Sequence, residues 1–187
     1  MTWFIDGGAH RGESIRLART LYGDPLSVLA IEPNAACWPE LAAENALLFP
    51  GALSTSTGSA PLYRGTYEVS ASLVREKTTG GISTENPIQV ATTTLSAILR
   101  ALPFGEQLVL KLDIEGAEYD VLEQALADKM LRWVSTLYVD FHADRIPAIG
   151  RERHNALVER LLSMGYALQK WLPIDGTVRE CGQGWLL

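Results

Sequence analysis

Charged side chains alternate with apolar ones in the strongly apolar segment that ends at Glu115. The pattern Lys111-Leu-Asp113-Ile-Glu115 places all three charged side chains on one face of an extended strand. Charges at the end of a buried strand cost free energy unless they are paired or used in chemistry. Asp140 and His142 repeat the arrangement on the next expected strand. If these strands are neighbours, Asp113, Glu115 and His142 meet at the carboxyl edge of the sheet, where α/β proteins bind ligands.

Three roles are open for this group of acidic residues and histidine. His142 is the best general base on intrinsic pKa, and Asp113 is placed to orient a reacting group. Alternatively, Asp113, Asp140 and His142 hold a divalent ion that lowers the pKa of an acceptor. A buried structural network is the third interpretation. We favour the base or orienting role and assign no metal ligand, while Lys111 either positions a substrate oxygen or neutralises Asp113 and Glu115.

A loop of small residues follows the first expected strand. Asp6 ends that strand, and Gly8 and Gly12 allow a tight turn that leaves backbone amides available at the start of a helix. Glu32 ends the second strand, where an acidic residue in nucleotide-binding α/β folds accepts hydrogen bonds from the two ribose hydroxyls. The loop and Glu32 together favour a nucleotide-like cofactor over a purely structural turn.

The spacing within this loop disfavours a dinucleotide. A pyrophosphate-binding loop has the pattern Gly-x-Gly-x-x-Gly, whose second glycine makes room for phosphate. This chain has Gly8-Ala9-His10-Arg11-Gly12, with the bulky His10 in the middle. Such a loop suits a cofactor without a pyrophosphate, such as S-adenosylmethionine, with Asp6 and the loop facing its amino-acid part and Glu32 facing its ribose.

The elements that position these groups alternate between short apolar runs and amphipathic stretches, which is typical of βαβ units and a mainly parallel sheet. We expect strands at residues 3–6, 27–31, 108–114 and 136–141, a weaker one at 47–53 interrupted by Pro50-Gly51, and a closing pair at 167–172 and 184–187. Helices are expected at 13–22, 38–46, 94–102, 119–127 and 151–164. His154 lies in a charged stretch of the last helix and is expected at the surface.

Residues 54–93 interrupt this alternation, because Ser, Thr and Gly dominate there. Long irregular segments inside compact domains are commonly binding loops. We expect the segment to shape an acceptor pocket in which Ser70 and Ser72, together with Glu115 and Asp140 from the sheet, contact the substrate. A poorly ordered insertion is the alternative.

Composition bounds the class of protein. A chain of 187 residues with 47% hydrophobic and 20% charged residues suits a single globular domain over 1–187. The net charge of −6 and the scattered basic residues disfavour long nucleic acids as partners. No apolar run approaches the ~20 residues of a membrane-spanning helix, and no signal-peptide pattern opens the chain, so we expect a cytoplasmic protein. Cys37 and Cys181 lack metal-type spacing and are expected to be reduced thiols.

Four motifs give the chain a specific resemblance: Phe4-Ile5-Asp6-Gly7-Gly8-Ala9-His10-Arg11-Gly12-Glu13, Ala30-Ile31-Glu32-Pro33-Asn34, Thr93-Thr94-Leu95 and Lys111-Leu112-Asp113-Ile114-Glu115-Gly116-Ala117-Glu118. Together they resemble the FkbM family of S-adenosylmethionine-dependent methyltransferases over nearly the whole chain. Three positions depart from the pattern: His10 stands where the family commonly has Asn, Ser96 where Asp is common, and Asp140 where Glu often precedes the x-His pair.

The resemblance implies a Rossmann-like class I methyltransferase fold: an α/β domain with a mostly parallel seven-stranded sheet, helices on both faces and an antiparallel C-terminal strand. It also implies methylation of a hydroxyl oxygen. The residues expected at the cofactor are Asp6, Gly8, Ala9, His10, Gly12, Glu13, Glu32, Pro33, Asn34 and Asp113. The catalytic residues expected are Asp113, His142 and Lys111.

The acceptor expected is a small molecule, a sugar or a glycolipid. A nicotinamide-dependent oxidoreductase and a cofactor-binding module without turnover are the alternative functions. Met1 lies only a few residues before the binding loop, so the helix that often covers the cofactor in this fold is not evident. We therefore expect either an open site or one covered by a second copy of the chain or another subunit.

Overall fold

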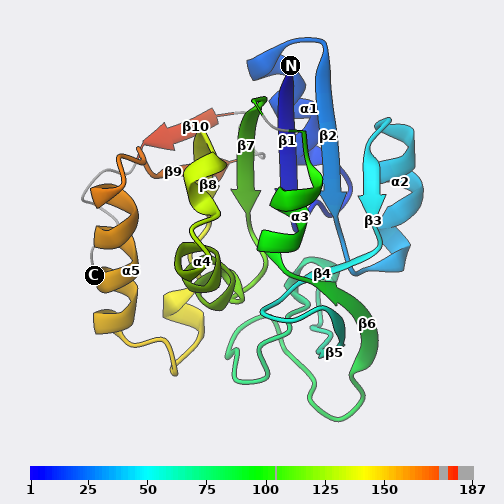
Figure 1. The fold of residues 1–187 in the computed structure, drawn as a ribbon. Coiled ribbons are helices and arrows are strands. Elements are labelled where there is room, and N and C mark those ends of the chain that lie inside the picture. Colours follow the sequence, from blue (N-terminus) through cyan, green and yellow to red (C-terminus); the bar gives the residue numbers. More distant parts are fainter. Residues whose placement is uncertain (104, 173–176, 181–187) are drawn as a thin grey trace.

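The structure of the chain, a computed structural model, describes residues 1–103, 105–172 and 177–180 (Figure 1). Its strands are β1 (Thr2–Gly7), β2 (Leu26–Ile31), β3 (Leu47–Phe49), β4 (Gly51–Leu53), β5 (Gly58–Leu62), β6 (Ile88–Thr93), β7 (Gln107–Leu112), β8 (Thr136–Val139), β9 (Gln169–Leu172) and β10 (Thr177–Glu180). Its α-helices are α1 (Glu13–Tyr22), α2 (Trp38–Ala43), α3 (Leu95–Ala101), α4 (Glu118–Ala127) and α5 (Arg151–Ser163).

The strands divide into two sheets, a seven-stranded main sheet and a smaller sheet that the sequence did not predict. The main sheet has the order β10-β9-β8-β7-β1-β2-β3, and β4, β6 and β5 form a separate three-stranded sheet. All pairs from β9 to β3 in the main sheet are parallel, while β10 is antiparallel to β9. The α/β class and the parallel character of the sheet are as expected.

Helices cover both faces of the main sheet because its central strands are apolar on both sides. On one face, Ile5 and Leu110 belong to a large core that includes residues of α3, α4 and α5. On the other face, Phe4 and Val109 pack with Ile15 of α1 and with residues of α2. Figure 1 shows α3 and α4 in front of the sheet and α1 behind it. This layering leaves the strand ends as the place where polar groups can reach a ligand.

The expected strand at 47–53 is split by Pro50 into β3 and β4, which belong to different sheets. Proline has no backbone N–H to donate to a ladder, so the chain leaves the main sheet there. At Gly51, a Cβ atom would lie 2.5 Å from the Ala91 carbonyl oxygen. Glycine therefore permits the close pairing of β4 with β6 that starts the second sheet.

Residues 54–93 are more ordered than the composition suggested. They contain β5 and β6, which pair in an antiparallel register from Gly58 opposite Thr92 to Leu62 opposite Ile88. The stretch between them holds an isolated bridge between Tyr63 and Ser72. In Figure 1 the second sheet lies beyond the carboxyl ends of β1, β2 and β7. It thus stands over the edge at which a ligand was expected.

In the C-terminal third, the expected exposure of His154 is wrong, and part of the expected closing pair of strands lies outside the described residues. His154 is buried, not exposed, because its Nδ1 atom lies 2.7 Å from the Tyr119 hydroxyl within the core. The strand that pairs with β9 is Thr177–Glu180. Residues 184–187, predicted as a strand, and Cys181, predicted to be a reduced thiol, lie outside the described residues.

Within the described ranges, no helix combines the length and the apolar character that a bilayer-spanning segment requires.

Candidate active site

A cavity of about 610 Å³ opens at the carboxyl edge of the main sheet, facing the second sheet. Small-molecule sites usually measure about 300–1,000 Å³. The cavity is lined by residues of the loop after β1 and the start of α1 (Gly8, Ala9, His10, Glu13, Ser14), of the end of β2 (Ile31, Glu32, Pro33, Asn34), of the second sheet and its loops (Ala52, Leu53, Leu62, Val69, Ala71, Ser72, Leu73), and of the ends of β7 and β8 (Lys111, Asp113, Ile114, Glu115, Ala117, Asp140).

Glu32 forms one end of this cavity, as expected. Its Oε2 atom accepts a hydrogen bond from the His10 amide at 2.8 Å, and its Oε1 atom accepts one from the Asn34 amide at 2.7 Å. Burial raises the pKa of Glu32, while the two amide hydrogen bonds oppose that shift. The amides fix the orientation of the carboxylate, and each oxygen keeps a further lone pair for a ligand hydroxyl.

The loop after β1 lies against the same end of the cavity. Gly8, Ala9, His10 and Glu13 all line it, and these four residues are among those expected at the cofactor. Gly8 has φ 78°, and a Cβ atom there would lie 2.0 Å from the Asp113 carbonyl oxygen. The glycine is therefore required by the approach of the β1 loop to β7, and not only by a ligand.

Asp6 and Gly12, which were predicted to contact the cofactor, do not line the cavity. Asp6 is completely buried, and its Oδ1 atom lies 3.1 Å from the Lys111 ammonium. Lys111 also donates a hydrogen bond to the Gly8 carbonyl at 2.8 Å. Gly12, at φ 83°, precedes α1 beside Glu44. These residues hold the loop in place rather than meet the ligand.

Lys111 remains a cation in this setting. Burial acts to lower the pKa of its ammonium, but the negative charges of Asp6 and Asp113 outweigh burial, so the pKa is raised. A charged, buried lysine tied to the loop suits neither a proton acceptor nor a mobile substrate contact. Of the roles predicted for Lys111, its position beside Asp6 and Asp113 favours charge neutralisation, and we interpret it as a positioning residue.

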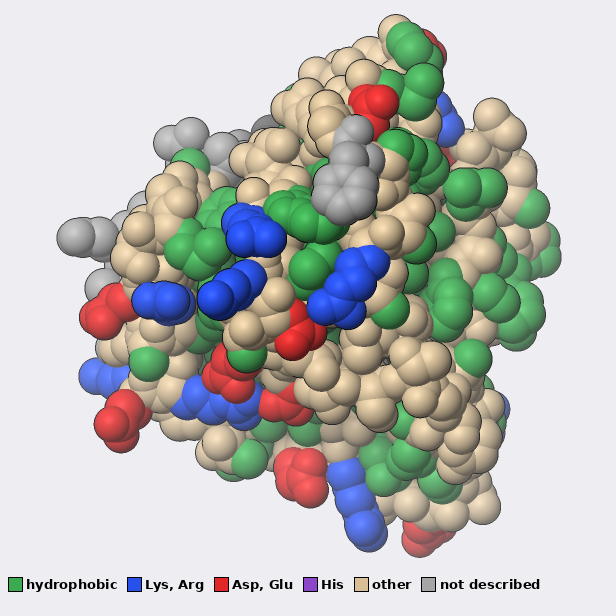
Figure 2. Space-filling model, in the orientation of Figure 1, with side chains coloured by type: hydrophobic (Ala, Val, Ile, Leu, Met, Phe, Trp, Pro, Cys, Tyr) green, Lys and Arg blue, Asp and Glu red, His purple; other side chains and the backbone are tan. Residues whose placement is uncertain are grey.

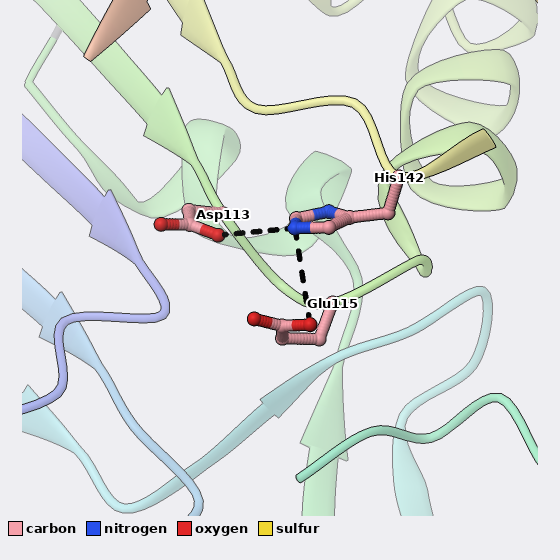
Figure 3. Close-up of side chains that lie close together, drawn as sticks. All are labelled: Asp113, Glu115 and His142. Atoms are coloured by element: carbon pink, nitrogen blue, oxygen red, sulfur yellow. Dashed lines mark ion pairs between the residues drawn. The ribbon is translucent and has the colours of Figure 1, made fainter. Parts of the chain in front are cut away.

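Three side chains converge at the other end of the cavity (Figure 3). The His142 Nε2 atom lies 3.7 Å from Oδ1 of Asp113 and 3.8 Å from Oε2 of Glu115. One potential ligand atom from each of the three residues lies within 4.8 Å of the others. The expected convergence of Asp113, Glu115 and His142 is therefore present, while Asp140 lines the cavity outside this group of three.

His142 stands behind the two carboxylates and does not line the cavity. Its Nδ1 atom lies 3.0 Å from Oε1 of Glu118, which is itself completely buried. Burial acts to lower the pKa of His142, but the hydrogen bond to Glu118 and the charges of Glu118, Glu115 and Asp113 raise that pKa to about 9. At neutral pH the imidazole thus carries a proton, which argues against its predicted service as a general base.

Glu118, the first residue of α4, holds the loop between β7 and α4 in place. Its Oε1 atom accepts a hydrogen bond from the Ile114 amide at 2.8 Å, and its Oε2 atom accepts one from the Gly116 amide at 2.9 Å. The loop between β7 and α4 is thereby folded back around one carboxylate. Glu115 adopts φ 55° in this loop, an uncommon conformation for a residue with a side chain.

Lys77 is a site residue that sequence reasoning missed. Its side chain is 1% exposed, and its ammonium lies 2.5 Å from Oε2 of Glu115. It also donates a hydrogen bond to the Ser70 carbonyl at 2.8 Å. Arg145 approaches the same Glu115 oxygen at 3.5 Å. The sequence around Lys77 is polar and has no periodicity, so nothing in it indicated that this lysine would be buried against the sheet.

The predicted substrate residues fall into two groups. Ser72, Glu115 and Asp140 line the cavity. The Ser72 hydroxyl donates a hydrogen bond to the Glu115 carbonyl at 2.7 Å. Ser70 does not line the cavity, because its hydroxyl is directed to the Tyr67 carbonyl at 2.6 Å. Its hydroxyl also donates to the Gly80 carbonyl at 3.1 Å, so Ser70 holds the segment between β5 and β6 together.

The fold and the cavity define an α/β protein with a ligand site at the carboxyl edge of a parallel sheet. The family model described as "Methyltransferase FkbM domain" matches residues 6–168. The chain belongs to this family of methyltransferases, and the resemblance drawn from its motifs is confirmed.

Among solved structures, the chain is similar to the crystal structure of methyltransferase FkbM from Methylobacillus flagellatus KT at 2.20 Å resolution. The identity is 14% and the TM-score is 0.44, and the match covers 72% of this chain and 38% of that one. The chain thus spans well under half of the length of the protein it matches. No curated protein matches the chain.

Proposed function

We propose that this protein transfers a methyl group from S-adenosylmethionine to a hydroxyl oxygen of a small molecule, a sugar or a glycolipid. The observation that carries the proposal is a cavity with Glu32, held by two amides, at one end and Asp113 beside His142 at the other. The first end suits a ribose, and the second suits a reacting group that must lose a proton.

The residues at the first end fit this cofactor. The anchored carboxylate of Glu32 accepts hydrogen bonds from two neighbouring hydroxyls, and Pro33 and Asn34 continue the wall beside it. Glu13, at the first turn of α1, supplies a negative charge suited to the ammonium of the amino-acid part. When bound, S-adenosylmethionine supplies a methyl group on a positively charged sulfur.

At the second end, Asp113 is the residue we assign to the acceptor. The Asp113 carboxylate would accept the proton of the acceptor hydroxyl whose oxygen receives the methyl group. Protonated His142, 3.7 Å from Asp113, orients this carboxylate from behind. Alignment of the reacting atoms contributes much of the rate in such a displacement.

Charge restricts the acceptor. Glu13, Glu32, Asp113, Glu115 and Asp140 all line the cavity, and they repel phosphate or carboxylate groups. On the face drawn in Figure 2, acidic and basic side chains lie next to one another rather than in separate areas. A neutral or cationic acceptor is therefore favoured over a long polyanion. The apolar side chains of Leu62, Val69 and Leu73 offer contacts for its non-reacting part.

The test measures cofactor binding by titration calorimetry with S-adenosylhomocysteine. Glu32→Gln keeps the size of the side chain but gives up one acceptor oxygen and the charge, so we expect at least a tenfold weaker affinity, which is about 1.4 kcal/mol. Glu85→Gln is the matched control, because Glu85 is exposed and lies outside the cavity. Equal affinities in the wild type and Glu32→Gln would remove the ribose assignment.

A further inference from the structure

We propose that Asp113, Glu115 and His142 form a binding site for a divalent metal ion at the acceptor end of the cavity. Each residue offers one ligand atom, and these atoms lie within 4.8 Å of one another. Figure 3 shows both carboxylates directed toward the imidazole. Asp113 and Glu115 also line the cavity, so an ion held there is open to a ligand from solvent or substrate.

The orientation of His142 is an independent sign of such a site. The residue is 1% exposed, and its Nδ1 atom is engaged by the buried carboxylate of Glu118. Its Nε2 atom has no hydrogen bond within the described residues, since the nearest carboxylate oxygens lie 3.7 and 3.8 Å away. A histidine ligand commonly has this arrangement, with one ring nitrogen fixed by a carboxylate and the other directed at the metal. A bound ion would replace the proton that Nε2 carries when no metal is present, because only the unprotonated nitrogen has a lone pair to donate.

The donor set indicates the class of ion. Two carboxylate oxygens and one imidazole nitrogen suit Mn²⁺ and related divalent ions, and three protein ligands leave open coordination positions. Asp113 would contribute its Oδ1 atom, while its Oδ2 atom lies near the Lys111 ammonium at 3.9 Å. The metal alternative drawn from sequence used Asp140. The geometry points to Glu115 in its place.

Two cations of the chain compete for the same carboxylate. The ammonium of Lys77 lies 2.5 Å from Oε2 of Glu115, and Arg145 lies 3.5 Å from it. A divalent ion must displace the ammonium from this oxygen or share Glu115 with it. Removing the positive charge of Lys77 should therefore strengthen metal binding, which a merely structural role of the cluster would not produce.

The experiment measures Mn²⁺ binding by electron paramagnetic resonance and by titration calorimetry, with no cofactor present. We expect one bound ion in the wild type. Asp113→Asn and Glu115→Gln should each weaken its binding by at least about tenfold. Lys77→Met should bind it severalfold more tightly, and Glu85→Gln should match the wild type. The metal proposal is overturned if neither the wild type nor Lys77→Met binds Mn²⁺, or if Asp113→Asn and Glu115→Gln bind it as the wild type does.

Two further measurements keep the result unambiguous. Circular dichroism of each variant establishes that it is folded, and Asp113→Asn is the safest substitution because Asp113 is partly exposed. Binding of S-adenosylhomocysteine to the same variants reports on the Glu32 end of the cavity. Because the metal is measured without cofactor, failure of the metal site and failure of the proposed methyl transfer give different results.

Discussion

At the scale of single residues, the site depends on two carboxylates that each accept hydrogen bonds from two backbone amides. Glu118 accepts hydrogen bonds from the amides of Ile114 and Gly116 and contacts His142, while Glu32 accepts from the amides of His10 and Asn34. A buried carboxylate that satisfies two amides fixes the loop that carries them. Each end of the cavity thus contains a loop fixed by a buried carboxylate. Glu32 lines the cavity, whereas Glu118 lies outside its lining and contacts His142.

The contribution of Glu118 is measurable as stability. Glu118→Ala leaves two buried amides and the His142 imidazolium without their acceptor, so we expect the free energy of unfolding to fall by about 3–5 kcal/mol. Glu123→Ala, on the same helix, removes only a partly exposed pair with Arg153 and should cost about 1 kcal/mol or less. Urea denaturation measures both. Equal losses in the two variants would contradict the role given to Glu118.

At the scale of elements, the site requires β1 and β7 to lie very close where their loops begin. Asp113 donates its amide hydrogen to the Gly7 carbonyl at 3.0 Å, and Gly8 passes directly over the Asp113 carbonyl. Lys111 then joins the two strands through Asp6 and the Gly8 carbonyl. This contact sets the distance between the cofactor loop and the acceptor end of the cavity.

Gly8→Ala tests this close approach. Alanine at φ 78° is strained, and its Cβ atom would lie 2.0 Å from the Asp113 carbonyl oxygen. Gly23→Ala is the control, because Gly23 has φ 72° and a Cβ atom there would meet nothing within 4 Å in the described part of the chain. We expect Gly23→Ala to cost about 1–2 kcal/mol from backbone strain alone. Gly8→Ala should cost at least about 1 kcal/mol more and weaken S-adenosylhomocysteine binding.

At the scale of the whole molecule, the second sheet is joined to the main sheet at the site itself. Leu53 of β4 belongs to the large core, and the Lys77 to Glu115 ion pair links the segment between β5 and β6 to the end of β7. Thr78 donates a backbone hydrogen bond to the Arg145 carbonyl at 2.8 Å. The second sheet therefore forms one wall of the cavity.

We expect residues 1–187 to unfold as one domain because these connections cross the cavity. Tryptophan fluorescence reports on the main sheet through Trp3 of β1 and Trp38 of α2, while far-ultraviolet circular dichroism reports on all elements. The two urea transitions should coincide, as in a two-state domain. Hydrogen exchange should give the amides of β6 protection comparable to those of β2. An earlier, separate loss of protection in β5 and β6 would count against a single cooperative unit.

The sequence predicted the parallel sheet, the meeting of β7 and β8 at one edge, and the position of Glu32 and its neighbouring loop. The alternation of apolar runs with helical stretches predicted the parallel sheet, and strand periodicity predicted that Asp113 and Glu115 share an edge with the end of β8. Glu32 and His10, both predicted at the cofactor, line the cavity. Family membership followed from the same motifs. These features are local in sequence, so side-chain periodicity and turn chemistry determine them.

Only the tertiary structure decided which polar groups meet the cavity and which are paired behind it. Asp6 forms an ion pair with Lys111, and His142 forms a hydrogen bond with Glu118. Lys77 forms an ion pair with Glu115 although it lies in a segment with no periodic pattern. A buried charge is strongly destabilising unless an opposite charge lies within a few ångströms of it in space. The partners in these pairs are widely separated in sequence. Sequence thus determined the strands, the loop and the identity of the acidic residues, whereas packing determined which of them remain open to a ligand.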